Sequence, residues 1–168
     1  MHIELIAVVA GVIRQLISQL RTGRPVIAVG TTSARTLESL YWLGARVSAD
    51  VSVAPQDLAV HQWDAYTRLD AYAPSSGEIG VEAALTALLD WMDRQGIGEL
   101  VTTTQLLIVP GYRWKIVKGL VTNFHQPEST LLLLIASLVG EDWRTMYRYA
   151  LDRGFRFLSY GDGCLLLP

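Results

Sequence analysis

Hydrophobic positions alternate along the chain between short β-branched runs and longer segments with helical spacing. The short runs predict strands at residues 2–8, 25–30, 100–109, 114–121, 155–159 and 164–167. In the longer segments apolar residues recur every three or four positions, which predicts helices at residues 9–20, 31–43, 78–95, 131–139 and 143–153. This alternation predicts an α/β domain in which a mixed sheet is flanked by helices.

The segment 45–76 departs from both patterns. It is rich in turn-forming and aromatic residues, so we expect an irregular insertion at residues 48–76. A chain of 168 residues can bury about 70% of the surface that it exposes when unfolded. We therefore expect residues 1–168 to form a single α/β domain with its own core.

Composition and charge narrow the function classes. With 51% hydrophobic and 18% charged residues, the chain is not of the disordered class. The longest apolar run, 131–139, is about half of the roughly 18 residues that a membrane span needs. No leader or anchor is recognisable, and the lone Cys164 suits a reducing compartment, so we expect a cytoplasmic protein.

The net charge of −2 provides no general attraction for nucleic acid. From residue 110 onward, however, seven Lys or Arg stand against five acids, so any contact with a polyanion is expected in that part. The three histidines and the cysteine show no metal-ligand spacing, and we expect no metal site.

A polar cluster precedes the apolar helix of residues 131–139. Ser129 or Thr130 can cap the helix, whose free N–H groups would then form an anion site. Asn123 and His125 would flank that site. Alternatively, Ser129 only caps the helix and His125 only satisfies a loop carbonyl.

The run GTTSAR has a similar arrangement, with a glycine at the end of a strand and two hydroxyls at the start of a helix. Gly30, Thr31 and Thr32 can hold a carboxylate or phosphate, with Arg35 as a cationic partner one turn later. A purely structural cap explains the same residues. We expect Gly44 to end this helix.

Two further segments carry candidate chemistry. In PGYRWK, strand alternation predicts that Tyr112 faces the core while the charged residues face solvent. In SYGDG, the turn after Tyr160 and Gly161 would leave the carboxylate of Asp162 free to accept hydrogen bonds or to remove a proton. Turn formation alone explains Asp and Gly equally well.

Taken together, four motifs resemble one known family. MHIE, GTTSARTLES, PGYRWKIVKGLVTNFHQPESTLL and FRFLSYGDGCLLL are similar, in this order, to the C-terminal half of S-adenosylmethionine:tRNA ribosyltransferase-isomerases of queuosine biosynthesis. The similarity covers residues 1–47 and 97–168, whereas 48–96 looks like an expansion. It implies the C-terminal part of the family's larger α/β domain.

The resemblance implies transfer and isomerisation of the ribosyl group of S-adenosylmethionine onto 7-aminomethyl-7-deazaguanine in tRNA, which gives epoxyqueuosine. S-adenosylmethionine would serve as the ribosyl-donating substrate, and Asp162 and His125 are the candidate proton carriers. The substrate-binding candidates are Gly30, Thr31, Thr32, Arg35, Tyr112, Asn123, Ser129, Thr130, Tyr160 and Gly161.

The chain departs from the family pattern in two respects. Gln126, Pro127 and Glu128 stand where the family usually has Leu, Pro and Lys, so a cation is replaced by an anion. Family members are also about twice as long as this chain. The alternatives are therefore a non-catalytic fragment that binds tRNA or S-adenosylmethionine, and an inactive half-domain that self-associates or needs an N-terminal half.

Overall fold

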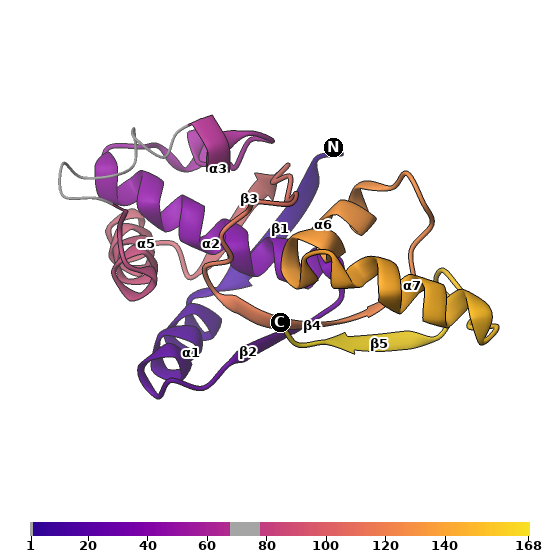
Figure 1. Ribbon diagram of the computed structural model, residues 1–168. Helices are drawn as coiled ribbons and strands as arrows, with labels where there is room; N and C mark the ends of the chain where they lie inside the picture. Colours follow the sequence, from indigo (N-terminus) through magenta and orange to yellow (C-terminus); the bar gives the residue numbers. More distant parts are fainter. Residues whose placement is uncertain (1, 68–77) are drawn as a thin grey trace.

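The computed structural model describes residues 2–67 and 78–168 (Figure 1). Met1 and residues 68–77, which include the end of the expected insertion, lie outside the described residues. The helices are α1 (Ala10–Arg21), α2 (Thr31–Ala49), η1 (Pro55–Asp57), α3 (Asp64–Thr67), α5 (Val81–Gln95), α6 (Thr130–Val139) and α7 (Asp142–Asp152). The strands are β1 (Glu4–Val9), β2 (Val26–Val29), β3 (Glu99–Thr104), β4 (Val117–Asn123) and β5 (Gly163–Leu166).

The described strands form two small sheets. β1 pairs antiparallel with β3, while β4 lies between β2 and β5 in the other sheet. β2 runs parallel to β4 and β5 runs antiparallel to it. The predicted α/β class with a mixed sheet and flanking helices is therefore confirmed.

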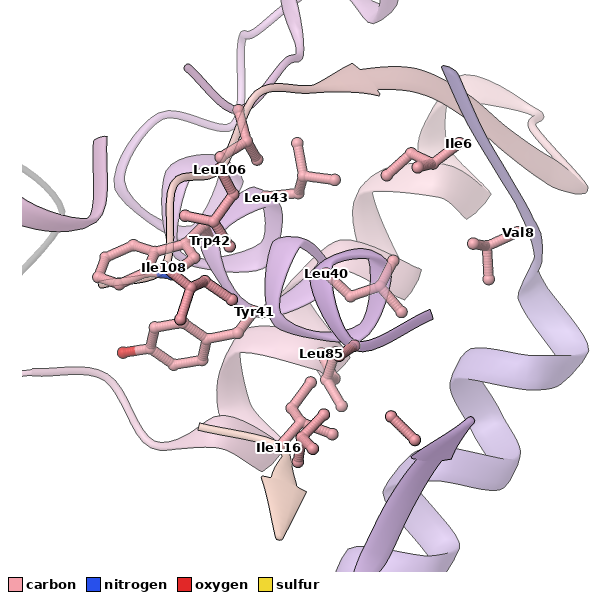
Figure 2. Packing of buried hydrophobic residues seen from close by; sticks show 14 of the residues in the cluster. Ile6, Val8, Leu40, Tyr41, Trp42, Leu43, Leu85, Leu106, Ile108 and Ile116 are labelled. Carbon is pink, nitrogen blue, oxygen red and sulfur yellow. The ribbon is translucent and has the colours of Figure 1, made fainter. Parts of the chain in front are cut away.

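The hydrophobic core is centred on α2. Its residue Leu40 is fully buried and lies in one cluster with Ile6 and Val8 of β1, Leu85 of α5 and Ile116 before β4 (Figure 2). Leu40 and Leu85 have the helical spacing of apolar residues that predicts α2 and α5. The core therefore joins the two-stranded sheet to the start of β4 through α2 and α5.

Gly44 does not end α2, which continues to Ala49, so that expectation is wrong. A Cβ atom at Gly44 would lie 2.1 Å from the backbone oxygen of Ala84 in α5. The glycine therefore lets the two helices approach closely. A signal interpreted as a helix stop is instead a packing requirement between helices.

Two predicted strands also differ from the structure. Residues 155–159 form a folded-back connection, in which Leu158 has a φ of 67° and its N–H donates to the Phe124 oxygen. The strand predicted at 100–109 ends at Thr104, whose hydroxyl accepts a hydrogen bond from the Leu106 N–H. In both cases the backbone N–H groups form hydrogen bonds with a loop carbonyl or a side-chain hydroxyl, and not with a neighbouring strand.

The sheet β2-β4-β5 has one covered and one bare face. α2 packs on the covered face, where Ala28, Leu120 and Leu166 are buried. On the opposite face, no described element covers the apolar side chains (Figure 1). Their exposed fractions are 37% for Ile27, 69% for Val29, 57% for Leu165 and 62% for Leu167. All-parallel sheets normally have both faces covered, whereas antiparallel sheets can leave one face to solvent.

Candidate active site

Three of the candidate segments meet at one edge of the sheet β2-β4-β5. The N–H of Gly30, directly after β2, donates to the Val121 oxygen of β4 at 2.8 Å. Asn123, at the end of β4, lies opposite Gly163 at the start of β5. Ligands in α/β sheets bind outside the carboxyl ends of the parallel strands, and this edge is that position.

His125 lies two residues beyond β4 in a half-buried position. Its Nε2 is 3.0 Å from the Thr122 hydroxyl, and its backbone N–H donates to the Tyr147 hydroxyl at 2.9 Å. Burial lowers the pKa of the imidazole below its ordinary value. The ring is therefore neutral near pH 7, the state in which it can accept a proton.

The Asp162 carboxylate is not free, contrary to the expectation from the turn. It accepts a hydrogen bond from the backbone N–H of Arg156 at 2.8 Å and another from the Arg156 guanidinium at 3.1 Å. The Arg156 backbone and guanidinium hydrogen bonds, in that order, hold the pKa of this carboxyl below its ordinary value. Asp162 is thus an ionised acceptor and a weak base.

The loop before Asp162 depends on a close backbone approach. A Cβ atom at Gly161 would lie 2.5 Å from the Arg156 oxygen, so a side chain does not fit there. The neighbouring Tyr160 is 95% exposed. Gly161 therefore shapes the loop, and Tyr160 is exposed to solvent.

Ser129 caps α6, as the sequence predicts. Its hydroxyl oxygen accepts from the Leu132 N–H at 3.3 Å and its hydroxyl donates to the Gln126 oxygen at 2.9 Å. The hydroxyl is thus engaged within its own turn. Thr130 is exposed at the first helical position, and a cavity of about 430 Å³ opens beside both residues.

At the start of α2, the structure differs from the expected cap. The N-cap residue is Gly30, with a φ of 89°, and no side chain makes a capping hydrogen bond. The positive φ suits glycine because it has no Cβ. The structural explanation for Thr31 and Thr32 as caps is therefore wrong, although both residues remain near the sheet edge.

Two binding candidates are held elsewhere. Arg35 has a side chain only 5% exposed, and its guanidinium pairs with the Glu4 carboxylate of β1. The buried Tyr112 accepts from Trp42 Nε1 at 3.0 Å and donates to a Glu38 carboxylate oxygen at 2.8 Å. Arg35 and Tyr112 are thus both paired with other residues of the fold.

The charged residues of PGYRWK do not behave alike, and the residues 110–115 are not a strand. Arg113 is exposed as expected, with 71% of its side chain accessible. Lys115 is only 9% exposed, pairs with Glu78, and lies 5.2 Å from the ring centroid of Tyr41. The expectation that Lys115 faces solvent is therefore wrong, because an acid and an aromatic ring compensate its burial.

The sequence interpretation missed Glu38, which is fully buried. Besides Tyr112, its carboxylate accepts from the backbone N–H groups of Lys115, Ile116 and Val117, at 2.9, 2.8 and 2.8 Å. A signal existed, since Glu38 has helical spacing with the inward-facing Tyr41. The carboxylate anchors the chain that enters β4, and so positions the candidate site indirectly.

Within residues 2–67 and 78–168, no group of His, Cys, Asp and Glu is arranged to hold a metal ion. In the same ranges, no helix combines the length and hydrophobicity that a membrane crossing requires.

Comparison with known proteins agrees with this architecture. A family model described as queuosine biosynthesis protein matches residues 1–166, a range that includes 48–96. The S-adenosylmethionine:tRNA ribosyltransferase-isomerase of Trichormus variabilis is 31% identical over 169 residues, covering 100% of this chain and 29% of that protein. That of Gloeobacter violaceus is 54% identical over 66 residues, covering 39% of this chain and 19% of that protein.

The fold is also similar to a solved structure. The crystal structure of an S-adenosylmethionine tRNA ribosyltransferase from Thermotoga maritima matches with a TM-score of 0.60 and 29% identity. The match covers 97% of this chain but 40% of that chain. The chain thus spans less than half of the solved relative and under a third of the curated relatives named above.

Proposed function

Since this chain belongs to the queuosine biosynthesis protein family, we propose that its sheet edge is a ribosyltransferase-isomerase site that acts in this chain by itself. The reaction transfers and isomerises the ribosyl group of S-adenosylmethionine onto 7-aminomethyl-7-deazaguanine in tRNA. The observation that carries the proposal is the meeting of Gly30, Asn123 and the loop before Gly163 at the carboxyl ends of β2 and β4.

His125 is the proposed general base. The reaction needs a group that removes a proton from the ribose carbon next to the sulfonium, whose positive sulfur stabilises the resulting carbanion. A neutral imidazole can take that proton, and the lowered pKa of His125 favours the neutral form. The hydrogen bond from its backbone to Tyr147 and the contact with Thr122 hold the ring in place.

Asp162 is proposed to bind rather than to remove protons. Its low pKa makes it a poor base, while its ionised carboxylate can accept hydrogen bonds from ribose hydroxyls. Arg156 orients it through both its backbone and its side chain. Asn123, Tyr160 and the exposed Thr32 are available to contact the remainder of the two substrates.

The proposal is tested by incubating the chain with tRNA carrying 7-aminomethyl-7-deazaguanine and S-adenosylmethionine labelled in the ribose. Label is expected in the tRNA, and His125→Ala is expected to reduce the rate by about 100-fold or more. Asp162→Asn is expected to raise KM more than it lowers kcat. The Thermotoga maritima relative serves as the positive control. Its success alongside no transfer by this chain would contradict the proposal.

The bare sheet face favours one alternative, a half-domain that acts through self-association. The side chains of Val29 and Leu165 are more than half exposed on that face, and contact between two copies would remove them from water. Light scattering over a range of concentrations tests this. A concentration-dependent mass that Leu165→Lys abolishes supports the alternative, and a constant monomer mass rejects it.

A further inference from the structure

We propose that the cavity between the start of α6 and the start of α7 binds a purine-type base, stacked on Trp143 with its donor edge toward Glu128. The inference rests on the proposed function, because both substrates of that reaction carry such a base. The proposed function assigns the reaction to the sheet edge. The inference adds the place where the base binds and two residues, Trp143 and Glu128, that determine which base is bound.

The size and lining of the cavity suit a flat heterocycle. Its volume of about 430 Å³ lies within the range of about 300–1,000 Å³ that is usual for small-molecule sites. Leu132, Leu133 and Ala136 of α6 provide apolar walls, and Trp143 of α7 lines the cavity as well. Sites of this kind combine apolar walls with a few polar groups that orient the ligand.

Trp143 is held in a defined orientation. Its ring forms a T-shaped pair with Tyr147, with 5.9 Å between the ring centroids, and the Arg144 guanidinium lies over the ring, 5.1 Å from its centroid. A half-buried indole fixed by two neighbours is a suitable stacking platform, because little side-chain entropy is lost when a base binds.

The charges around the cavity favour hydrogen-bond donors over anions. Glu128, Glu141 and Arg144 line it, and Arg144 forms an ion pair with Glu141. Among the described residues, no basic side chain forms an ion pair with Glu128. Its carboxylate therefore disfavours a phosphate or carboxylate at this end of α6 and favours the N–H groups of a base.

Two sources of such a base exist in the proposed reaction. The adenine of S-adenosylmethionine offers one amino group as donor. The 7-aminomethyl-7-deazaguanine of tRNA offers a ring N–H, an amino group and a cationic aminomethyl group. A carboxylate can pair with the ring N–H and the amino group together, so Glu128 matters more for the deazaguanine.

Calorimetry with the chain and two separate probes tests the inference. The probes are the free base 7-aminomethyl-7-deazaguanine and methylthioadenosine, an adenine nucleoside without the sulfonium charge. Trp143→Leu is expected to weaken binding about tenfold or more, whereas Trp143→Phe retains most of it. Glu128→Gln is expected to weaken binding of the deazaguanine about tenfold while leaving methylthioadenosine unchanged.

Tyr149→Ala is the matched control, because Tyr149 is an exposed aromatic residue of the same helix that does not line the cavity. It is expected to leave both affinities unchanged. Binding of only one probe, lost in Trp143→Leu and retained in Trp143→Phe, supports the inference and identifies the source of the base. Binding of neither probe by the unaltered chain, or equal binding by Trp143→Leu, overturns it.

These outcomes separate the inference from the proposed function. Equilibrium binding requires no transfer, so an inactive chain that binds a probe through Trp143 supports the cavity and contradicts the function. Conversely, an active chain in which Trp143→Leu and Glu128→Gln leave KM for tRNA and for S-adenosylmethionine unchanged retains the function and overturns the cavity assignment.

Discussion

The carboxylates of Glu38 in α2 and Asp162 before β5 both accept backbone N–H groups, yet their surroundings differ. Glu38 is fully buried and accepts four hydrogen bonds, from Tyr112 and three successive backbone groups. Asp162 accepts two hydrogen bonds, from the backbone N–H and the guanidinium of Arg156, and it is partly exposed.

The same difference distinguishes the region around Glu38, which anchors the chain that enters β4, from the candidate site around Asp162. Burial raises the pKa of Glu38 despite its hydrogen bonds, whereas hydrogen bonds from Arg156 lower that of Asp162. The four hydrogen bonds that Glu38 accepts all come from groups of the fold, so its carboxylate has little capacity left for a ligand. At the sheet edge, the partly exposed polar groups can still form hydrogen bonds with a ligand.

The largest expected effect comes from Glu38→Ala. It would leave buried N–H and O–H donors without an acceptor, at a cost of about 1–3 kcal/mol for each group. We expect a loss of about 4 kcal/mol or more in the free energy of unfolding, measured with denaturant. Glu82→Gln, which removes an exposed ion pair with Arg21, should cost less than about 1 kcal/mol. Similar losses in both variants would contradict the anchoring role.

Gly44→Ala should have the next largest effect. The new Cβ atom would collide with the backbone of Ala84, so α2 and α5 must separate. Overpacking of this kind costs about 1–3 kcal/mol, and a collision with backbone is expected at the upper end of that range. Gly11→Ala, at a helical position with nothing near the added Cβ, provides the control and should not destabilise the protein. An equally stable Gly44→Ala protein would refute the close approach.

The two helix starts at the candidate site should respond differently to loss of a hydroxyl. Ser129→Ala removes the cap of α6 and is expected to cost about 1 kcal/mol. Thr32→Ala removes no capping bond, and alanine is the better helix former, so stability should stay equal or rise slightly. Denaturant unfolding of the two variants side by side measures the difference. Equal losses would show that α2 also depends on a side-chain cap.

The smallest expected effect concerns pH. Because the pKa of His125 is lowered in the folded chain, the unfolded chain binds the proton more readily. Stability should therefore fall as pH decreases through about 6.5, the ordinary histidine value. His125→Gln removes this contribution and should flatten the dependence of the unfolding midpoint between about pH 5 and 7. His2→Gln, which keeps His125, should retain the slope, and an unchanged slope in His125→Gln would contradict burial of the ring.

Local patterns predict much of the fold. The helical spacing in α5 and α6 reflects an apolar face that packing requires, and the Ser129 cap depends only on residues within one turn. Gly44 shows the limit of such patterns. A glycine that ends a helix and one that admits a neighbouring helix look alike in sequence, because the neighbour lies forty residues away at Ala84.

The sequence could indicate only those neighbours at the candidate site that lie close together along the chain. Asn123, His125 and Ser129 stand within one short segment, whereas their proximity to Gly30 follows from the parallel pairing of β2 with β4. The engagement of Arg35 by Glu4 joins residues from different elements. No local pattern distinguishes an arginine that pairs with a carboxylate of the fold from an arginine that is available to bind an anionic ligand.

The sequence by itself determined the α/β class, most helices and strands, the cap of α6 and the motifs that resemble the family. These features depend on hydrophobic periodicity and on contacts within a few residues. Only the tertiary structure decided that Glu38 anchors the entry to β4, that Asp162 is held by Arg156, and that one sheet face is left uncovered by the part of the chain that the structure describes. Each of these depends on distant segments meeting, where burial and pairing are set by neighbours that local sequence does not specify.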